Sequence, residues 1–61
     1  MPSLRYTVSA DIDGRVVQRE YSTFAMANDA FQDAIKADAF RVVIFDRTVI
    51  IAQYDSEASG A

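Results

Sequence analysis

The sequence of 61 residues contains no cysteine and no histidine, a single proline and only two glycines. Without cysteine the chain has no disulfide and no thiolate to act as a nucleophile or a metal ligand. Without histidine it lacks the commonest general base and the commonest metal ligand. Neither a glycine-rich phosphate-binding motif nor a nucleophile motif is present. The sequence therefore predicts no enzyme, no cofactor and no metal site.

Long apolar runs are absent as well. No segment approaches the roughly 20 apolar residues of a membrane span, and the N-terminus has no hydrophobic signal core. The expected location is therefore the cytoplasm. Six basic residues stand against nine acidic ones, for a net charge of −3, which argues against binding to a phosphate backbone and fits a basic partner.

Small size limits how such a chain can be stabilised. A domain of about 60 residues buries only about 60% of its unfolded surface, so it commonly depends on disulfides, a metal or association. The first two are excluded, and 51% hydrophobic residues indicate a folded domain. Association with a partner or a second copy is therefore expected.

An alternating strand opens the chain and leads into a hairpin. Apolar residues recur at every second position from Leu4 to Ile12, which is typical of a half-buried strand. Asp13-Gly14 predicts a two-residue type I′ turn that pairs Ile12 with Arg15. In this register Arg19 is a charge on the apolar face, and on an edge strand its head could reach water.

A helix is predicted from Phe24 to Asp38, with Ser22 or Thr23 as its cap. Steps of three and four define its apolar stripe, which consists of Phe24, Ala27, Phe31, Ala34 and Ile35. The opposite side carries Met26 beside carboxylates and is a candidate docking surface.

The segment from Phe40 to Tyr54 is the most apolar of the chain and predicts two further strands with a turn at Asp46-Arg47. Both faces of this hairpin are apolar. A two-residue turn would place one set of side chains under the helix, namely Phe40, Val42, Ile44, Val49 and Ile51. The opposite face would carry Val43, Phe45, Ile50, Ala52 and Tyr54. A loop of three or four residues is the alternative, and it would change this assignment.

The predicted fold class is α+β, in the order ββαββ. We expect a four-stranded, mainly antiparallel sheet with one helix packed on one face. Residues 1–54 would form a single domain, and residues 55–61 a disordered C-terminal tail. Two sheet orders remain open. The first strand lies beside the third with all pairs antiparallel, or the second lies beside the third with one parallel pair.

Protein binding is the function that these features favour, through one of two surfaces. The first is the apolar face that the helix leaves uncovered, with Val43, Phe45, Ile50 and Tyr54. The second is the outer side of the helix, with Met26, Asp29, Asp33 and Asp38. A homodimer with an antitoxin-like or regulatory role is the alternative. A single-stranded nucleic-acid binder, with Phe45 and Tyr54 stacking on bases, comes third, and direct nucleic-acid binding is not expected.

In size, acidity and lack of catalytic motifs, the chain resembles small phage-encoded inhibitors of host machinery, including anti-CRISPR proteins. This resemblance implies an inhibitor that blocks a partner's surface in the host cytoplasm. Such a surface could be a basic nucleic-acid channel, with carboxylates in place of phosphates. Over Tyr6–Ala34, the order of strand, Asp-Gly turn, strand and Ser/Thr-started helix is also similar to antitoxins of the HicB type.

Overall fold

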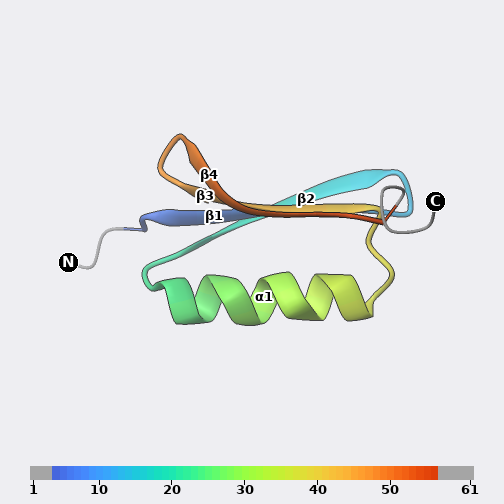
Figure 1. Cartoon of the computed structure of the whole chain (residues 1–61), viewed down its shortest axis with the longest axis horizontal. Helices are drawn as coiled ribbons and strands as arrows, with labels where there is room; N and C mark the ends of the chain where they lie inside the picture. Colours follow the sequence, from blue (N-terminus) through green and yellow to red (C-terminus); the bar gives the residue numbers. More distant parts are fainter. Residues whose placement is uncertain (1–3, 57–61) are drawn as a thin grey trace.

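The structure is a computed structural model that describes residues 4–56. Its elements follow the predicted order ββαββ (Figure 1). They are β1 (Tyr6–Ile12), β2 (Arg15–Tyr21), α1 (Phe24–Lys36), β3 (Arg41–Asp46) and β4 (Val49–Asp55). The strands form a four-stranded antiparallel sheet in the order β2-β1-β3-β4. The α+β fold is therefore confirmed, and of the two open sheet orders the one with β1 beside β3 is observed.

The first hairpin has the register that its turn predicts. Ile12 lies opposite Arg15, and Val8 lies opposite Arg19. Asp13 and Gly14 both have positive φ, at 53° and 77°, as a type I′ turn requires. Arg19 therefore lies on the helix side of an edge strand, as predicted.

Helix α1 begins where a hydroxyl cap is available. The side chain of Thr23 accepts a hydrogen bond from the backbone N–H of Met26 at 3.3 Å, which satisfies one of the free donors of the first turn. The helix ends at Lys36, two residues before the predicted end. Asp38 leaves the helix with φ of 62°, and the N–H groups of Asp38 and Ala39 donate to the carbonyls of Ile35 and Ala34. This is a Schellman ending with aspartate in the place of glycine.

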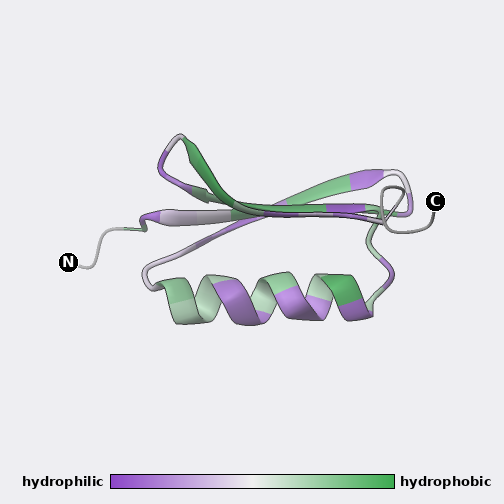
Figure 2. Ribbon diagram, viewed as in Figure 1, coloured by the Kyte–Doolittle hydropathy of each residue, from purple (hydrophilic) through white to green (hydrophobic). Residues whose placement is uncertain are grey.

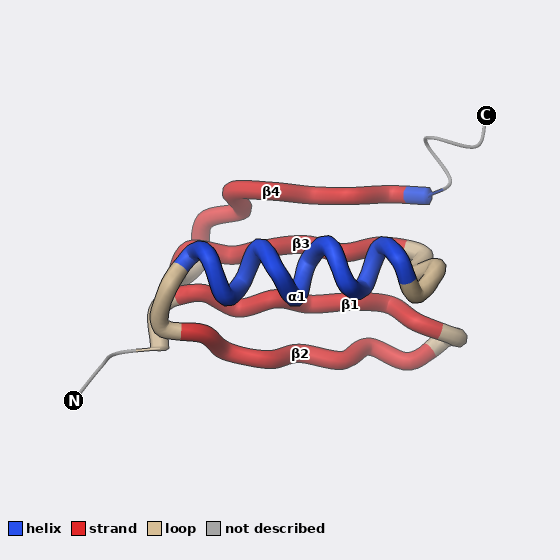
Figure 3. Tube along the Cα trace, turned by 90° about the horizontal axis from the view of Figure 1, so that it is seen from below, coloured by secondary structure: helices blue, strands red, loops and turns tan. Residues whose placement is uncertain are grey.

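The core lies between the helix and the two middle strands. Figure 3 shows α1 over β1 and β3, with β2 and β4 on either side of it. A helix is about 10 Å wide and strands are about 4.8 Å apart, so one helix covers about two strands. The fully or nearly fully buried side chains follow this line, and they are Val8, Ala10, Ala27, Phe31, Ala39, Val42 and Ile44.

The second hairpin differs from its prediction in two ways. Its turn is Arg47-Thr48, so Asp46 belongs to β3 and lies opposite Val49. Moving the turn by one residue shifts the strand pairing by two residues. This change alone leaves every side chain on its predicted face, because side chains alternate with a period of two. The second change is a register shift in which Ile51 has no opposite residue. Such a bulge moves all later residues to the other face.

Tyr54 is the candidate residue that this bulge relocates. It was predicted on the uncovered face, but it lies opposite Val42 and packs against the core, as Ala52 does opposite Ile44. The prediction was therefore wrong for Tyr54 and Ala52. Phe40 was predicted under the helix and is instead largely exposed.

The strand β4 extends past the predicted domain boundary at residue 54. Asp55 is its last residue, lies opposite Arg41 and makes an ion pair with it at 3.4 Å. The backbone N–H and the hydroxyl of Ser56 both donate to the carbonyl of Phe40. The predicted tail is thus ordered in its first two residues, and residues 57–61 lie outside the described part of the chain.

Candidate protein-binding surface

The face of the sheet opposite α1 is half polar and half apolar. Strands β1 and β2 contribute mostly polar groups there, such as Ser9, Gln18 and Glu20. The apolar half lies on β3 and β4, where Val43 and Phe45 alternate with residues of the other face and Ile50 lies opposite Phe45. Three of the four predicted residues of this surface are therefore brought together.

Exposed aliphatic side chains surround the end of the second hairpin, with Ile50 on the face of Phe45 and Val49 on the helix-side face opposite Asp46. We call Phe45, Val49, Ile50 and Ile51 the hairpin patch. Val49 is 62% exposed, Ile50 is 54% exposed and Ile51 is 43% exposed. In Figure 1 the β3–β4 turn rises away from α1, and Figure 2 shows β4 as strongly hydrophobic next to this turn. Val49 keeps its predicted helix-side face but is exposed at the end of the hairpin, and Ile51, also predicted under the helix, is exposed at the register shift.

The two edge strands of the sheet differ in the charge that they carry. Edge strand β2 carries the charged residues Arg15, Arg19 and Glu20, and charges on an edge discourage pairing with other chains. Edge strand β4 carries no charge from Val49 to Tyr54. An exposed, uncharged, apolar edge is the feature that marks a contact site or an aggregation site.

An ion pair fixes the hairpin to the start of the sheet. Arg5 donates to the carboxylate of Asp46 through Nε at 2.6 Å and through Nη2 at 2.9 Å. This two-point geometry is the strong form of the arginine–carboxylate contact. The hydrogen bond from Arg5, together with its charge, lowers the pKa of Asp46 below the usual aspartate value. Asp46 is thereby held as a carboxylate beside the hairpin patch.

The second predicted surface lies on the other layer. Met26, Asp29 and Asp33 are exposed on α1, and Asp38 is exposed just after its end. None of the three carboxylates forms an ion pair within residues 4–56. The sheet lies between these residues and Val43, Phe45 and Ile50 (Figure 1), so the two predicted surfaces do not combine into one site.

Sequence reasoning missed the exposure of Val49 and Ile51 and the groove beside Arg19 and Tyr21. The exposure of Ile51 was missed because nothing in the local sequence indicates a bulge, whereas Val49 keeps its predicted face opposite Asp46 and is exposed because it lies at the end of the hairpin. Arg19 and Tyr21 line an open groove between β2 and α1. The sequence did mark Arg19 as unusual, because it is a charged residue in an otherwise apolar alternation.

Comparison of the chain with models of known protein families, with curated proteins and with solved structures finds no match. In the described residues, no group of three or more acidic, histidine or cysteine side chains is arranged to hold a metal ion. The helix in that same part of the chain is too short and too polar to cross a membrane.

Proposed function

We propose that this chain is a non-catalytic protein-binding module that occupies a surface of its partner through the hairpin patch, as a small inhibitor does. The observation that carries the proposal is the gathering of exposed aliphatic side chains at one end of an uncharged edge strand. Exposed apolar side chains gathered in this way on a small domain are typical of an interaction site.

The free energies of burial and association indicate how large the contact must be. Burying a half-exposed aliphatic side chain completely contributes about 1 kcal/mol, so Val49, Ile50 and Ile51 together supply about 3 kcal/mol. Association costs about 4–15 kcal/mol in lost freedom. The contact must therefore extend over Val43 and Phe45 as well, along the apolar half of the sheet face.

Side-chain packing fits this surface better than addition of a partner strand to the sheet. The bulge at Ile51 interrupts the regular ladder of β4, and bulges on an edge work against strand addition. The neighbouring Arg5–Asp46 pair leaves a paired, polar rim beside the apolar centre, which is the usual arrangement of a protein interface.

Substitution of Ile50 by aspartate tests the proposal. Ile50→Asp should weaken binding of the purified partner at least about tenfold, because a central apolar contact is replaced by a charge. Val16→Asp is the matched control, since Val16 is 65% exposed on the same sheet face but on β2. The partner is obtained by affinity capture with the wild-type chain, and binding is measured by calorimetry.

Two results would contradict the proposal. One is equal loss of affinity in Ile50→Asp and Val16→Asp, and the other is full affinity in both. Sedimentation equilibrium of the chain alone decides the homodimer alternative. Self-association that Ile50→Asp abolishes and Val16→Asp retains would identify the partner as a second copy.

An inhibitor that places carboxylates in a basic channel is the second candidate. Its support is the unpaired, exposed state of Asp29, Asp33 and Asp38 within residues 4–56. Binding of this kind should weaken as salt rises from low to physiological concentration, because exposed charges are screened. The double substitution Asp29→Asn and Asp33→Asn should weaken it further. Affinity that depends on neither salt nor these residues would exclude this mechanism.

A further inference from the structure

A groove runs between α1 and the edge strand β2, at the opposite edge of the sheet from the hairpin patch. It is open to solvent and has a volume of about 280 Å³. It exists because α1 lies over β1 and β3 and leaves β2 uncovered (Figure 3). The helix side of the groove is formed by the small residues Ala30 and Ala34, which do not fill the space above the strands.

The floor of the groove is apolar. Val8 and Ala10 are among the buried residues of the core, and Ile12 and Val17 continue the same surface toward the first turn. Because Val8 and Ala10 are already covered, a ligand that rests here would contact mainly the aliphatic carbon of Ile12, Val17 and Ala34, which is the usual lining of a small-molecule site.

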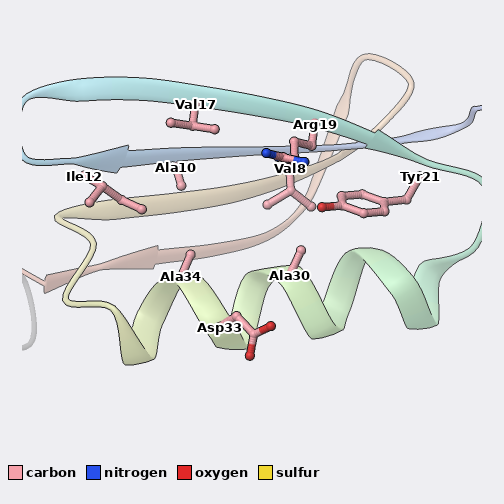
Figure 4. Close-up of a pocket in the computed structure, with 9 residues that line it drawn as sticks. All are labelled: Val8, Ala10, Ile12, Val17, Arg19, Tyr21, Ala30, Asp33 and Ala34. Atoms are coloured by element: carbon pink, nitrogen blue, oxygen red, sulfur yellow. The ribbon is translucent and has the colours of Figure 1, made fainter.

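Two hydrogen-bond donors lie at one end of this floor. Arg19 lies opposite Val8 across the β1–β2 pair, and Figure 4 shows its guanidinium group beside Val8, with the hydroxyl of Tyr21 directed toward the same side chain. Within residues 4–56 neither side chain forms a hydrogen bond, and Arg19 forms no ion pair. Protection of the edge strand against pairing explains the charge of Arg19. It does not explain the hollow or the position of Tyr21 beside it.

The charges around the groove favour an anion at this end. Asp33 is the acidic residue that lines it. In Figure 4 its carboxylate lies lower on the helix, away from the strands, whereas Ala30 and Ala34 point toward them. A carboxylate near Val8 would therefore meet the guanidinium before it meets Asp33. Arginine and a phenol are both good donors to a carboxylate.

We propose that the α1–β2 groove binds a small amphipathic monocarboxylate. Its carboxylate accepts hydrogen bonds from Arg19 and Tyr21, and its apolar body lies along Ile12, Val17 and Ala34, above the buried Val8 and Ala10. Sites for drug-sized ligands begin at about 300 Å³, so the hollow suits a compact molecule such as a medium-chain or aromatic acid. The inference does not depend on the proposed protein-binding function, because the groove lies at the other edge of the sheet.

Octanoate is the probe for this site, with octylammonium as the comparison of opposite charge. Titration of the full chain with octanoate, followed by amide NMR shifts, should move signals of Val8, Ala10, Val17 and Ala30 and leave those of β4 in place. Octylammonium should bind at least about tenfold more weakly, since it places a cation beside a guanidinium. Equal binding of the two probes would overturn the proposal.

Arg19→Gln removes the charge and keeps a polar side chain of similar length. It should weaken octanoate binding at least about tenfold, because a charge-assisted hydrogen bond is lost. Arg15→Gln is the matched control, since Arg15 lies on the same strand but does not line the groove. Asp33→Asn should tighten binding about twofold by removing a like charge. An equal effect of Arg19→Gln and Arg15→Gln would contradict the assignment.

Filling the hollow is the independent test. Ala34→Leu adds a side chain to the helix wall of the groove and should abolish octanoate binding while all charges remain. Ala25→Leu, at an exposed helix position outside the groove, should leave binding unchanged, and circular dichroism confirms that both variants fold. Octanoate binding that survives Ala34→Leu would overturn the proposal. Binding of a peptide that ends in leucine by the wild-type chain, without binding of octanoate, would also overturn the proposal.

Discussion

At the scale of single residues, Asp38 holds the least favourable backbone conformation of the helix ending. Its φ of 62° is left-handed, a region that costs non-glycine residues roughly 1–2 kcal/mol and that aspartate tolerates better than most. The two hydrogen bonds of the Schellman ending, from Asp38 to Ile35 and from Ala39 to Ala34, hold it there. Asp38 therefore has a backbone role in ending the helix.

Asp38→Gly should raise the free energy of unfolding by about 0.5–1 kcal/mol, because glycine adopts this φ without strain. Urea denaturation followed by circular dichroism measures the change. Gln32→Gly, at an exposed position within α1, is the control and should lower stability by about 0.5 kcal/mol. Destabilisation by both substitutions would show that the conformation of Asp38 carries no strain.

At the scale of elements, the second hairpin shows how one extra residue redirects a strand. The bulge at Ile51 exchanges the faces of Ala52 and Tyr54 and leaves aliphatic side chains on the outside of β4. The result is a strand whose C-terminal half completes the core and whose N-terminal half forms the hairpin patch. Without the bulge, Ile51 would follow Ile44 into the core and Tyr54 would be on the uncovered face.

The same substitution at two isoleucines of this hairpin should separate these environments. Ile44 is fully buried, whereas Ile51 is 43% exposed. Ile44→Val should lower the free energy of unfolding by about 1 kcal/mol, because a buried methylene is lost. Ile51→Val should change it by less than about 0.5 kcal/mol. Equal losses in thermal or urea unfolding would place Ile51 in the core and contradict the observed bulge.

At the scale of the whole molecule, Arg5 and Asp46 join the start of the first strand to the end of the third across 41 positions of sequence. The pKa of Asp46 is lowered by this contact, so its folded value lies below its unfolded value. The contact therefore stabilises the fold fully above the unfolded pKa, at about 4, and the stabilisation is lost as the pH falls through the folded pKa.

Asp46→Asn should accordingly be less stable than the wild type at neutral pH, and the difference should shrink as the pH falls below about 4. Urea unfolding at a series of pH values measures it. Asp29→Asn serves as the control, because Asp29 forms no ion pair within residues 4–56, and its difference from the wild type should stay small throughout. A difference for Asp46→Asn that is constant with pH would exclude the ion pair as its origin.

One helix over a four-stranded sheet leaves surplus surface in two places. On the helix side, the uncovered strand β2 forms the groove with α1. On the other side, the apolar half of β3 and β4 has no layer above it. Both candidate sites follow from this ratio of helix to sheet, and they lie at opposite edges of the sheet.

The sequence by itself determined the elements, the register of the first hairpin and the fold class. Each depends on local rules, namely the period-two alternation from Leu4 to Ile12, the positive φ that Asp13-Gly14 permits, and the steps of three and four between Phe24 and Ile35. The uncovered positions of Val43, Phe45 and Ile50 followed from the same alternation.

Only the tertiary structure decided the position of Tyr54, the exposure of Val49 and Ile51, and the groove at Arg19. A bulge depends on how a strand fits its neighbour and the core, and β4 has apolar residues on both faces, so its pattern specifies register weakly. The choice of β1 as the neighbour of β3 likewise depends on contacts between distant segments. That choice places β2 at the edge beyond the helix, and it is the physical reason that Arg19 and Tyr21 border an open groove.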